Sequence, residues 1–222
     1  MRKLILNLMC GIAGIAPAKN DYDRLWPERS SETIKHRGPD ASGEWWSADN
    51  QVGLAHKRLS IIDLSEKADQ PMSYKLGNCT IIFNGEIYNF KFLRNLLEEK
   101  GYKFETKSDT EVLLKSYHYW GSKCLDKLEG MYAFAIYDEN ENKLFLARDR
   151  AGEKPLYYSH INNKLIFCSE LKGLLTHRDI NRIINIDALN CYLSMGFVPG
   201  DLSIISKINK LPAGSFMEYK IK

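Results

Sequence analysis

The sequence lacks any apolar run that could cross a membrane. Its apolar stretches fall well short of the roughly 18–20 residues that a membrane-spanning helix needs. The basic start Met1–Lys3 and the apolar residues 4–6 resemble the beginning of a signal peptide, but Asn7 interrupts the run before it reaches the usual length of about 7–15 residues. We therefore expect no membrane association and a cytoplasmic location.

The sequence also lacks an excess of charge and a pattern of paired cysteines. Its 31 basic and 28 acidic residues are well mixed, and the net charge of +3 is too small and too scattered to indicate a nucleic-acid partner. The cysteines are Cys10, Cys79, Cys124, Cys168 and Cys191. Their number is odd and no two have C-x-x-C spacing, which argues against a disulfide framework and against a metal site. Reduced thiols in the cytoplasm fit best.

The remaining composition is that of one substantial globular domain, with 44% hydrophobic residues in 222. Apolar and β-branched runs predict short strands at residues 10–16, 43–48, 51–57, 80–83, 131–137, 143–148, 156–160, 164–168 and 211–220. Helical spacing predicts helices at residues 21–35, 90–100, 108–121 and 187–193. Ser108 and Glu111 match a capping box, and Asp187 is the expected cap of the last helix. Short strands joined by tight turns indicate an α+β fold of antiparallel sheets with helices outside.

Three polar clusters interrupt this periodic pattern, each at the end of an expected strand or the start of an expected helix. They are Arg58-Leu59-Ser60-Ile61-Ile62, Asn84-Gly85-Glu86 and Ser108-Asp109-Thr110-Glu111. Scaffolds present functional groups at such edges. Taken singly, each has an ordinary interpretation: Asp109 as a helix cap, Asn84-Gly85 as a hairpin turn, and Cys10 as a buried strand residue.

Taken together and in order, the motifs resemble the class II glutamine amidotransferase domain of glutamine-hydrolysing asparagine synthetases. The resemblance rests on Cys10-Gly11-Ile12-Ala13-Gly14, His36-Arg37-Gly38-Pro39-Asp40, Arg58–Ile62, Gln70-Pro71, Asn84–Asn89 and Ser108–Glu111. Residues 130–135, 148–158 and 169–172 extend it, so that it covers nearly everything from residue 10 to about residue 214. It implies a four-layer αββα sandwich of two antiparallel sheets, the N-terminal-nucleophile hydrolase fold.

The resemblance also implies an activity, the hydrolysis of L-glutamine to glutamate and ammonia through a cysteine thioester. Cys10 would be the nucleophile, with its own α-amino group as general base, since an α-amine titrates at about pH 7.7–8.0. Asn84 and Gly85 would donate to the oxyanion. The implied glutamine-binding residues are Arg58, Leu59, Ser60, Ile61, Ile62, Asn84, Gly85, Glu86 and Asp109.

Within that set, Arg58 would pair with the glutamine carboxylate, whereas Asp109 and Glu86 would face its ammonium group. Residues 36–40 resemble a segment near the glutamine pocket and are a candidate lid. The charged residues 148–154 are interpreted as a turn and ion-pair scaffold, and Glu111 as a capping residue.

Full asparagine synthetases also resemble an ATP-pyrophosphatase domain with a Ser-Gly-Gly-x-Asp-Ser loop, which this sequence does not contain. Residues 10–222 are therefore expected to be the glutaminase half, which needs no cofactor, with ATP and Mg²⁺ used only by the synthetase domain. The ammonia would go to a synthetase domain or subunit. Residues 1–9 are expected to be an extension that is removed or that precedes the true start, because Met9 comes directly before Cys10.

Two other functions stay open at this point. One is an amidotransferase of the sugar-phosphate or phosphoribosyl type, although such enzymes carry a His-Thr-Arg-Trp-like segment where this chain has Ala55-His56-Lys57-Arg58-Leu59-Ser60. The other is a non-catalytic regulatory module or a decayed fragment, in which the N-terminal extension blocks the amine of Cys10.

Overall fold

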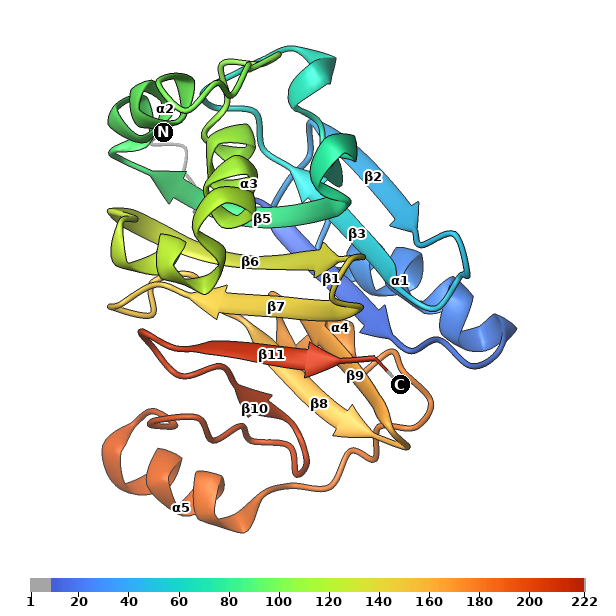
Figure 1. Ribbon diagram of the computed structural model, residues 1–222. Coiled ribbons are helices and arrows are strands. Elements are labelled where there is room, and N and C mark those ends of the chain that lie inside the picture. The colour runs from blue at the N-terminus through green and yellow to red at the C-terminus, as the bar shows by residue number, and fades with distance from the viewer. Residues whose placement is uncertain (1–8, 222) are drawn as a thin grey trace, which may run out of the picture.

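The computed structural model describes residues 9–221, and their strands form two antiparallel sheets that lie face to face (Figure 1). The first sheet has the order β10-β8-β9-β1-β3-β2, and the second has the order β11-β7-β6-β5-β4. The strands are β1 (Gly11–Ala16), β2 (Ala41–Trp46), β3 (Gly53–Arg58), β4 (Met72–Tyr74), β5 (Cys79–Ile87), β6 (Gly130–Asp138), β7 (Lys143–Arg148), β8 (Tyr157–Ile161), β9 (Lys164–Cys168), β10 (Asn209–Lys210) and β11 (Phe216–Lys220). The helices are α1 (Asp21–Thr33), α2 (Phe90–Glu98), α3 (Asp109–Trp120), α4 (Leu171–Leu174) and α5 (Ile186–Met195), with short 3₁₀ turns at Glu66–Ala68, Lys75–Gly77 and Gly121–Asp126.

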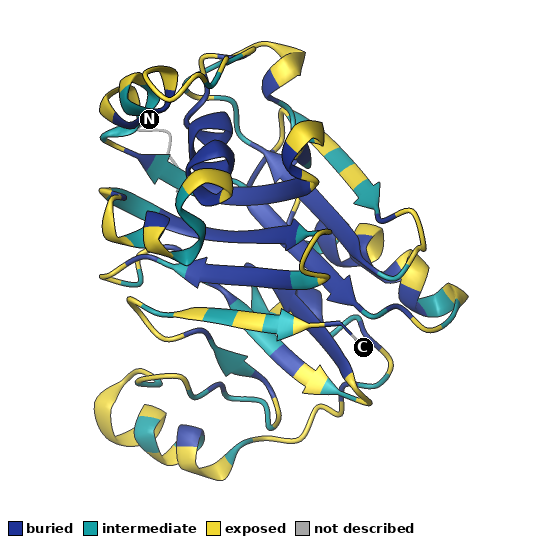
Figure 2. Cartoon of the chain, in the orientation of Figure 1, coloured by how far each residue is buried: buried dark blue, intermediate teal, exposed yellow. Residues whose placement is uncertain are grey.

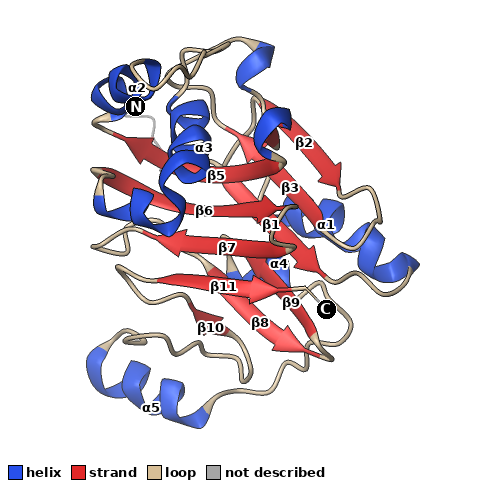
Figure 3. Ribbon diagram, in the orientation of Figure 1, coloured by secondary structure: helices blue, strands red, loops and turns tan. Residues whose placement is uncertain are grey.

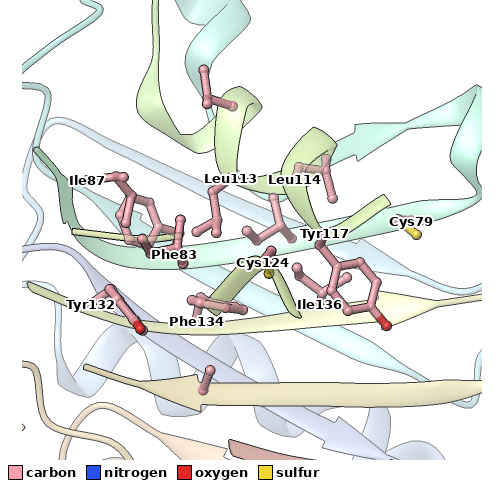
Figure 4. Close-up of a cluster of buried hydrophobic side chains, with 14 of the residues drawn as sticks. Cys79, Phe83, Ile87, Leu113, Leu114, Tyr117, Cys124, Tyr132, Phe134 and Ile136 are labelled. Atoms are coloured by element: carbon pink, nitrogen blue, oxygen red, sulfur yellow. The ribbon is translucent and has the colours of Figure 1, made fainter. Parts of the chain in front are cut away.

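Strand alternation divides the core into three layers of side chains. Residues such as Ile12 and Leu54 of the first sheet meet Ile82 and Leu146 of the second between the sheets. The opposite face of the second sheet packs against α2 and α3, and that of the first packs against α1 and α4 (Figure 3). Figure 4 shows the layer between α3 and strands β5 and β6. The expected four-layer αββα sandwich is therefore confirmed.

The central strands owe their position to residues that are buried on both faces. Every residue of β1 is buried, and β1 lies between β3 and β9 in the first sheet (Figure 2). Its sequence GIAGIA is small enough for close packing: a side chain at Gly14 would collide with the ring of Phe167 on β9. Cys10 stands directly before this rigid strand, so its place is fixed by the sheet.

Helix caps agree with the expectations at α3 but not at α5. The Ser108 side chain accepts from Glu111 N–H at 3.2 Å, as predicted. The prediction that Asp187 caps the last helix is wrong, because Asn185 Oδ1 accepts from the amides of Asp187 and Ala188 and the helix begins at Ile186.

Glu111 is more than a capping residue. Its carboxylate is nearly fully buried, accepts from the amides of Glu105 and Thr106, and pairs with Lys115 one turn along α3. It therefore fixes the segment that enters α3 rather than closing a reciprocal capping box on Ser108.

Asn84 and Gly85 lie within β5 and do not form a hairpin turn. They pair with Ala133 and Tyr132 of β6, and the strand continues to Ile87. The hairpin interpretation of these two residues is therefore wrong. A long partner strand overrides the local turn preference of Asn-Gly because pairing satisfies the backbone of all nine residues of β5 along one edge.

Among residues 9–221, no helix has both the length and the apolar character required to cross a bilayer.

His56 of β3 links the two sheets directly. Its ring is fully buried, and Nε2 lies 3.1 Å from the carbonyl oxygen of Phe83 on β5. Since a carbonyl only accepts, Nε2 carries a proton. The imidazole is neutral because Nδ1 is buried with no hydrogen-bond partner among residues 9–221 and the pKa of the ring is low. Burial lowers the pKa of His56 to about 3, the hydrogen bond to Phe83 opposing that shift.

This neutral histidine makes the fold sensitive to acid. Below about pH 6.5 the unfolded chain binds a proton at His56 that the folded chain does not, so stability falls as pH falls, by about 1.4 kcal/mol per pH unit from this residue. We expect His56→Gln to remove that slope. The free energy of unfolding of wild type and variant is measured in urea at pH 7.5 and at pH 5.5. Between these two pH values, the wild type should lose about 1.4 kcal/mol more than the variant.

The control is His160→Gln, which removes an imidazole from an exposed position on β8. It separates the effect of burial from the loss of a histidine as such. Parallel pH profiles for wild type and His56→Gln would contradict a buried neutral imidazole at this site.

Candidate active site

A cavity of about 120 Å³ lies where the start of β1 approaches the end of β5, between the two sheets. The predicted residues that line it are Cys10, Arg58, Leu59, Ile61, Ile62, Asn84, Gly85, Glu86 and Asp109. These come from four segments far apart in the sequence. Ser60 is the exception: it does not line the cavity, and its N–H donates to Asp40 Oδ2 at 2.8 Å.

Cys10 is held at the cavity by main-chain contacts. Its Sγ lies 3.4 Å from Leu59 N, which donates to it, and 3.6 Å from Leu59 O. Its carbonyl oxygen accepts from Arg37 Nε at 2.9 Å. Burial raises the pKa of the thiol, and the Leu59 amide together with the charges of Arg58 and Arg37 opposes this rise.

The backbone edge of β5 faces the same cavity. Strand β4 pairs with β5 only as far as Ile81, so the later groups on that edge have no strand partner. Side chains take over: Gln70 Oε1 accepts from Phe83 N at 2.6 Å, and Asp109 Oδ2 accepts from Ile87 N at 3.0 Å. Gly85 lies midway between these two residues and points the same way, because strand groups alternate in direction. Among residues 9–221 its N–H has no hydrogen-bond partner.

Gly85 also has to be glycine for steric reasons. A Cβ at this position would collide with the carbonyl of Met131 and with Cα of Tyr132 on the paired strand. The backbone amide can therefore stand at the cavity wall without a side chain beside it.

Asn84 presents a second donor that has no partner. The residue is 1% exposed, and neither Oδ1 nor Nδ2 of its side chain has a hydrogen-bond partner among residues 9–221. Leaving buried amide atoms unpaired costs about 1–3 kcal/mol, so such atoms are rare without a function. The Asn84 amide and the Gly85 N–H are adjacent in sequence and line the cavity that also contains Cys10.

Asp109 and Glu86 supply negative charge to the cavity. Asp109 is the first residue of α3 and is 5% exposed. Burial raises its pKa to about 6, with the neighbouring Glu86 charge contributing to the rise and the amide of Ile87 opposing it. Two acidic groups in one cavity suit a cationic ligand group.

Arg58 lines the cavity with its guanidinium already bound by the following loop. Nη1 donates to Asp69 and to Ser65 O, and Nη2 donates to Asp63 O. The side chain is nearly fully buried, so these contacts compensate the charge. The expected pairing of Arg58 with a ligand carboxylate remains a prediction. Among residues 9–221, Nε–H and one hydrogen of Nη2 have no hydrogen-bond partner, so two of its five donors are left for a ligand.

Several cavity residues were not predicted from the sequence. They are Met9, Asp63, Ala68, Gln70, Phe83, Ser108, Thr110, Met131 and Lys154. Gln70 belongs to a quoted motif, but no local pattern shows that its side chain reaches Phe83 N on another strand. Lys154 belongs to the segment that was interpreted only as scaffold.

The segment 148–154 is a turn scaffold, but not through ion pairs. Arg148 donates to the carbonyls of Gly152, Lys154 and Leu211, and the Asp149 carboxylate accepts from main-chain amides. The ion-pair part of the earlier interpretation is therefore wrong for Arg148, which binds main-chain carbonyls.

Residues 36–40 contain a charge cluster beside Cys10. His36 Nε2 and Arg37 Nη1 both lie within about 3 Å of Glu170 Oε1, at 2.9 and 3.0 Å. Whether this segment moves as a lid stays a prediction.

Comparisons with known proteins show the family to which this chain belongs. The sequence profile of a family described as "Glutamine amidotransferase domain" matches residues 9–222. Asparagine synthetase [glutamine-hydrolyzing] 1 of Bacillus subtilis is 43% identical over 213 residues, which cover 93% of this chain and 33% of that protein. Asparagine synthetase [glutamine-hydrolyzing] 3 of the same organism is 42% identical over 192 residues, which cover 85% of this chain and 31% of that protein. The chain thus spans about a third of the length of these relatives.

The fold is similar to that of a solved structure with low sequence identity. The glutamine phosphoribosylpyrophosphate amidotransferase of B. subtilis, complexed with ADP and GMP, superposes with a TM-score of 0.63 at 18% identity. The match covers 95% of this chain and 49% of that one. With the family profile matching nearly the whole described structure, the chain belongs to the glutamine amidotransferase domain family.

Proposed function

We propose that this chain hydrolyses L-glutamine to glutamate and ammonia, with Cys10 as the nucleophile. The observation that carries the proposal is the unpartnered Asn84 amide, buried in the cavity that contains the Cys10 thiol. The open Gly85 N–H next to it completes a pair of donors. Such a pair suits the oxyanion of a tetrahedral intermediate, which forms only during the reaction.

The first half of the reaction forms a thioester. The neutral α-amine of Cys10 takes the proton from Sγ, directly or through water, and the thiolate attacks the side-chain amide carbon of glutamine. The electron pair of the C=O bond moves onto oxygen, where Asn84 and Gly85 stabilise it. As the intermediate collapses, the C–N bond breaks and nitrogen takes the proton from the α-ammonium group, so that ammonia leaves.

The second half hydrolyses the thioester. Water attacks the same carbon while the α-amine takes one of its protons, and the oxyanion again lies against Asn84 and Gly85. The C–S bond then breaks, Sγ recovers a proton, and glutamate leaves. The domain uses no cofactor in this scheme, because every proton is exchanged between Cys10, the substrate and water.

The rest of the cavity recognises the amino-acid part of glutamine. Asp109 and Glu86 face the α-ammonium group. Arg58 keeps its contact with Asp69 and offers Nε–H and the remaining Nη2 hydrogen to the α-carboxylate. The main chain of the loop from Leu59 to Ile62 borders the substrate. Ser60 contributes through the main chain of this loop, since its N–H fixes the loop to Asp40.

The base requires that Cys10 be the first residue. With Met9 attached, the Cys10 nitrogen is an amide that cannot accept a proton, and Met9 itself lines the cavity. We therefore include in the proposal that residues 1–9 are absent from the working protein. The form that keeps Met9 has a blocked amine at Cys10, and it corresponds to the non-catalytic alternative.

The proposed acceptor of the ammonia is a synthetase domain or subunit that makes asparagine in the cytoplasm, using ATP and Mg²⁺. The names of the relatives at 43% and 42% identity support this choice over sugar-phosphate or phosphoribosyl acceptors. The segment around α5 supports a partner of some kind. Its large apolar side chains are half to three-quarters exposed at Ile183, Ile184, Ile186, Tyr192, Leu193, Met195 and Phe197, which is the composition of a contact surface.

The proposal is tested by measuring glutamate release from the form whose intact mass shows Cys10 at the N-terminus. We expect turnover in this form, and none after Cys10→Ala. Asn84→Ala should lower kcat by a factor of about 10²–10³, because one oxyanion donor is lost. The matched control is Asn95→Ala on the exposed face of α2, which should keep the wild-type rate.

Two outcomes would count against the proposal. Full turnover with Met1 to Met9 still attached would show that a free amine is not the base. A folded protein with exposed Cys10 that releases no glutamate would favour the non-catalytic module.

Asp109 offers a test of substrate recognition that is separate from chemistry. Above about pH 4 the unfolded chain ionises Asp109 more readily than the folded chain, because the folded pKa is raised to about 6. The free energy of unfolding therefore falls as pH rises through this range, by up to about 3 kcal/mol at pH 8. Asp109→Asn keeps an oxygen for Ile87 N–H and removes this cost. We expect the variant to be at least as stable as wild type in urea at pH 8, yet to have a KM for glutamine at least tenfold higher.

The same carboxylate should give the wild type a pH-dependent KM. Below about pH 6 Asp109 becomes neutral, so the KM of the wild type should rise toward that of Asp109→Asn, whereas the KM of the variant should stay nearly flat. A variant that is less stable at pH 8 and unchanged in KM would show that Asp109 serves the fold and not the substrate.

A further inference from the structure

Lys154 is a buried cation in the same cavity, and the reaction scheme above does not use it. It lies in the turn between β7 and β8, is 6% exposed, and lines the cavity with Cys10. Its main chain is fixed, because its N–H donates to Asp149 Oδ2 at 3.0 Å. The side chain is therefore directed to this place by the turn.

The ammonium group of Lys154 has an unusual partner. Nζ lies 3.0 Å from Sδ of Met9, and among residues 9–221 no carboxylate forms an ion pair with it. A thioether is a weak acceptor, so the contact compensates little of the buried charge. Burial lowers the pKa of Lys154, and the nearby charge of Arg37 adds to that effect.

The other charges near Cys10 are compensated or negative. Arg37 is paired with Glu170, and Arg58 is paired with Asp69. Asp109 and Glu86 face the cavity from α3 and β5, Glu153 is exposed beside Lys154, and the Asp149 carboxylate is occupied by main-chain amides. Among residues 9–221, Lys154 is thus a cation beside Cys10 that has no carboxylate within ion-pair distance, although Glu153 and Asp149 act on it from farther away and oppose the fall in its pKa.

We propose that Lys154 is a positioning residue for the charge state of Cys10: its ammonium group favours the deprotonated forms of the Cys10 amine and thiol. The inference rests on the proposed hydrolysis at Cys10. Met9 is bonded to the Cys10 nitrogen, and its side chain reaches Lys154, so the ammonium group is separated from that nitrogen by no more than one methionine side chain and one contact. Lys154 and Cys10 line the same cavity, and the charge of Cys10 acts on the pKa of Lys154. A nearby positive charge disfavours an ammonium group and favours a thiolate.

This arrangement helps both proton transfers of the thioester step. A larger fraction of the amine is neutral at a given pH and can take the Sγ proton. Once the amine is protonated, repulsion between two ammonium groups favours passing that proton on to the leaving nitrogen. The proton moves from Sγ to the amine and then to the leaving group, and Lys154 itself gains and loses none.

The experiment compares pH profiles of kcat/KM for glutamine in the protein that begins at Cys10. In Lys154→Met the acidic limb should move to higher pH by about 0.5–1 unit, while the rate on the alkaline side approaches that of wild type. Lys154→Arg keeps the charge and should keep the wild-type profile. Lys143→Met removes a mostly buried lysine at the far end of β7 and should leave the profile unchanged.

A second readout does not depend on turnover. The rate at which iodoacetamide alkylates Cys10, followed by mass spectrometry of the N-terminal peptide, reports the thiolate fraction at each pH. Lys154→Met should shift this curve to higher pH as well. A protein that releases no glutamate but shows the shift would refute the proposed hydrolysis and leave the role of Lys154 intact.

Two results would overturn the inference. One is unshifted alkylation and activity profiles in a folded Lys154→Met variant. The other is an equal loss of activity at every pH in Lys154→Met and Lys154→Arg, which indicates packing in place of charge. If Lys154→Met fails to fold, Lys154→Gln provides a neutral polar side chain for the same two measurements.

Discussion

The site depends on one constraint, the need to satisfy the backbone edge of β5 beyond the point where β4 ends. Buried main-chain groups must find partners, and here the partners are side chains from three different segments. The Gln70 side chain accepts from Phe83 N–H, and the Asp109 carboxylate accepts from Ile87 N–H. The His56 ring donates to Phe83 O. These contacts hold the strand in place on either side of Gly85, whose amide is left without a partner on that edge among residues 9–221. The donor is therefore positioned by contacts that its own residue does not make.

Several groups at this site are held in states that reduce stability. The Asn84 amide is buried without partners, and Asp109 keeps a carboxylate where burial disfavours its charge. Lys154 adds a cation that faces a thioether. The sandwich can carry these costs because the strands beneath are buried on both faces and tie the site to two apolar layers. Several groups that each lower the stability of the fold, all in one cavity, are typical of an active site.

The sequence predicted the fold class and half of the residues that line the cavity, because ordered motifs together resemble a known family. Cys10, Asn84 and Asp109 could be named through that resemblance, although each taken singly has an ordinary structural interpretation. What it could not predict are contacts between distant segments. Asn84-Gly85 has the local pattern of a turn, yet pairing with β6 makes it strand, and Arg58 is bound by Asp69 through a loop that has no periodicity. Asn185 caps the last helix in place of Asp187, because the helix begins at Ile186, two residues before the start that a cap at Asp187 implies.

Residue 9 connects the charge balance of the cavity to the start of the chain. Met9 N–H donates to Arg37 O at 3.0 Å, while Met9 Sδ is the contact of the Lys154 ammonium group. One residue is thus bonded to the Cys10 nitrogen and is also the hydrogen-bond partner of the Lys154 ammonium group. In the proposed mechanism, loss of Met9 turns the amide into an amine and at the same time brings that amine under the influence of Lys154. The base and the charge that adjusts its protonation therefore arise in a single event.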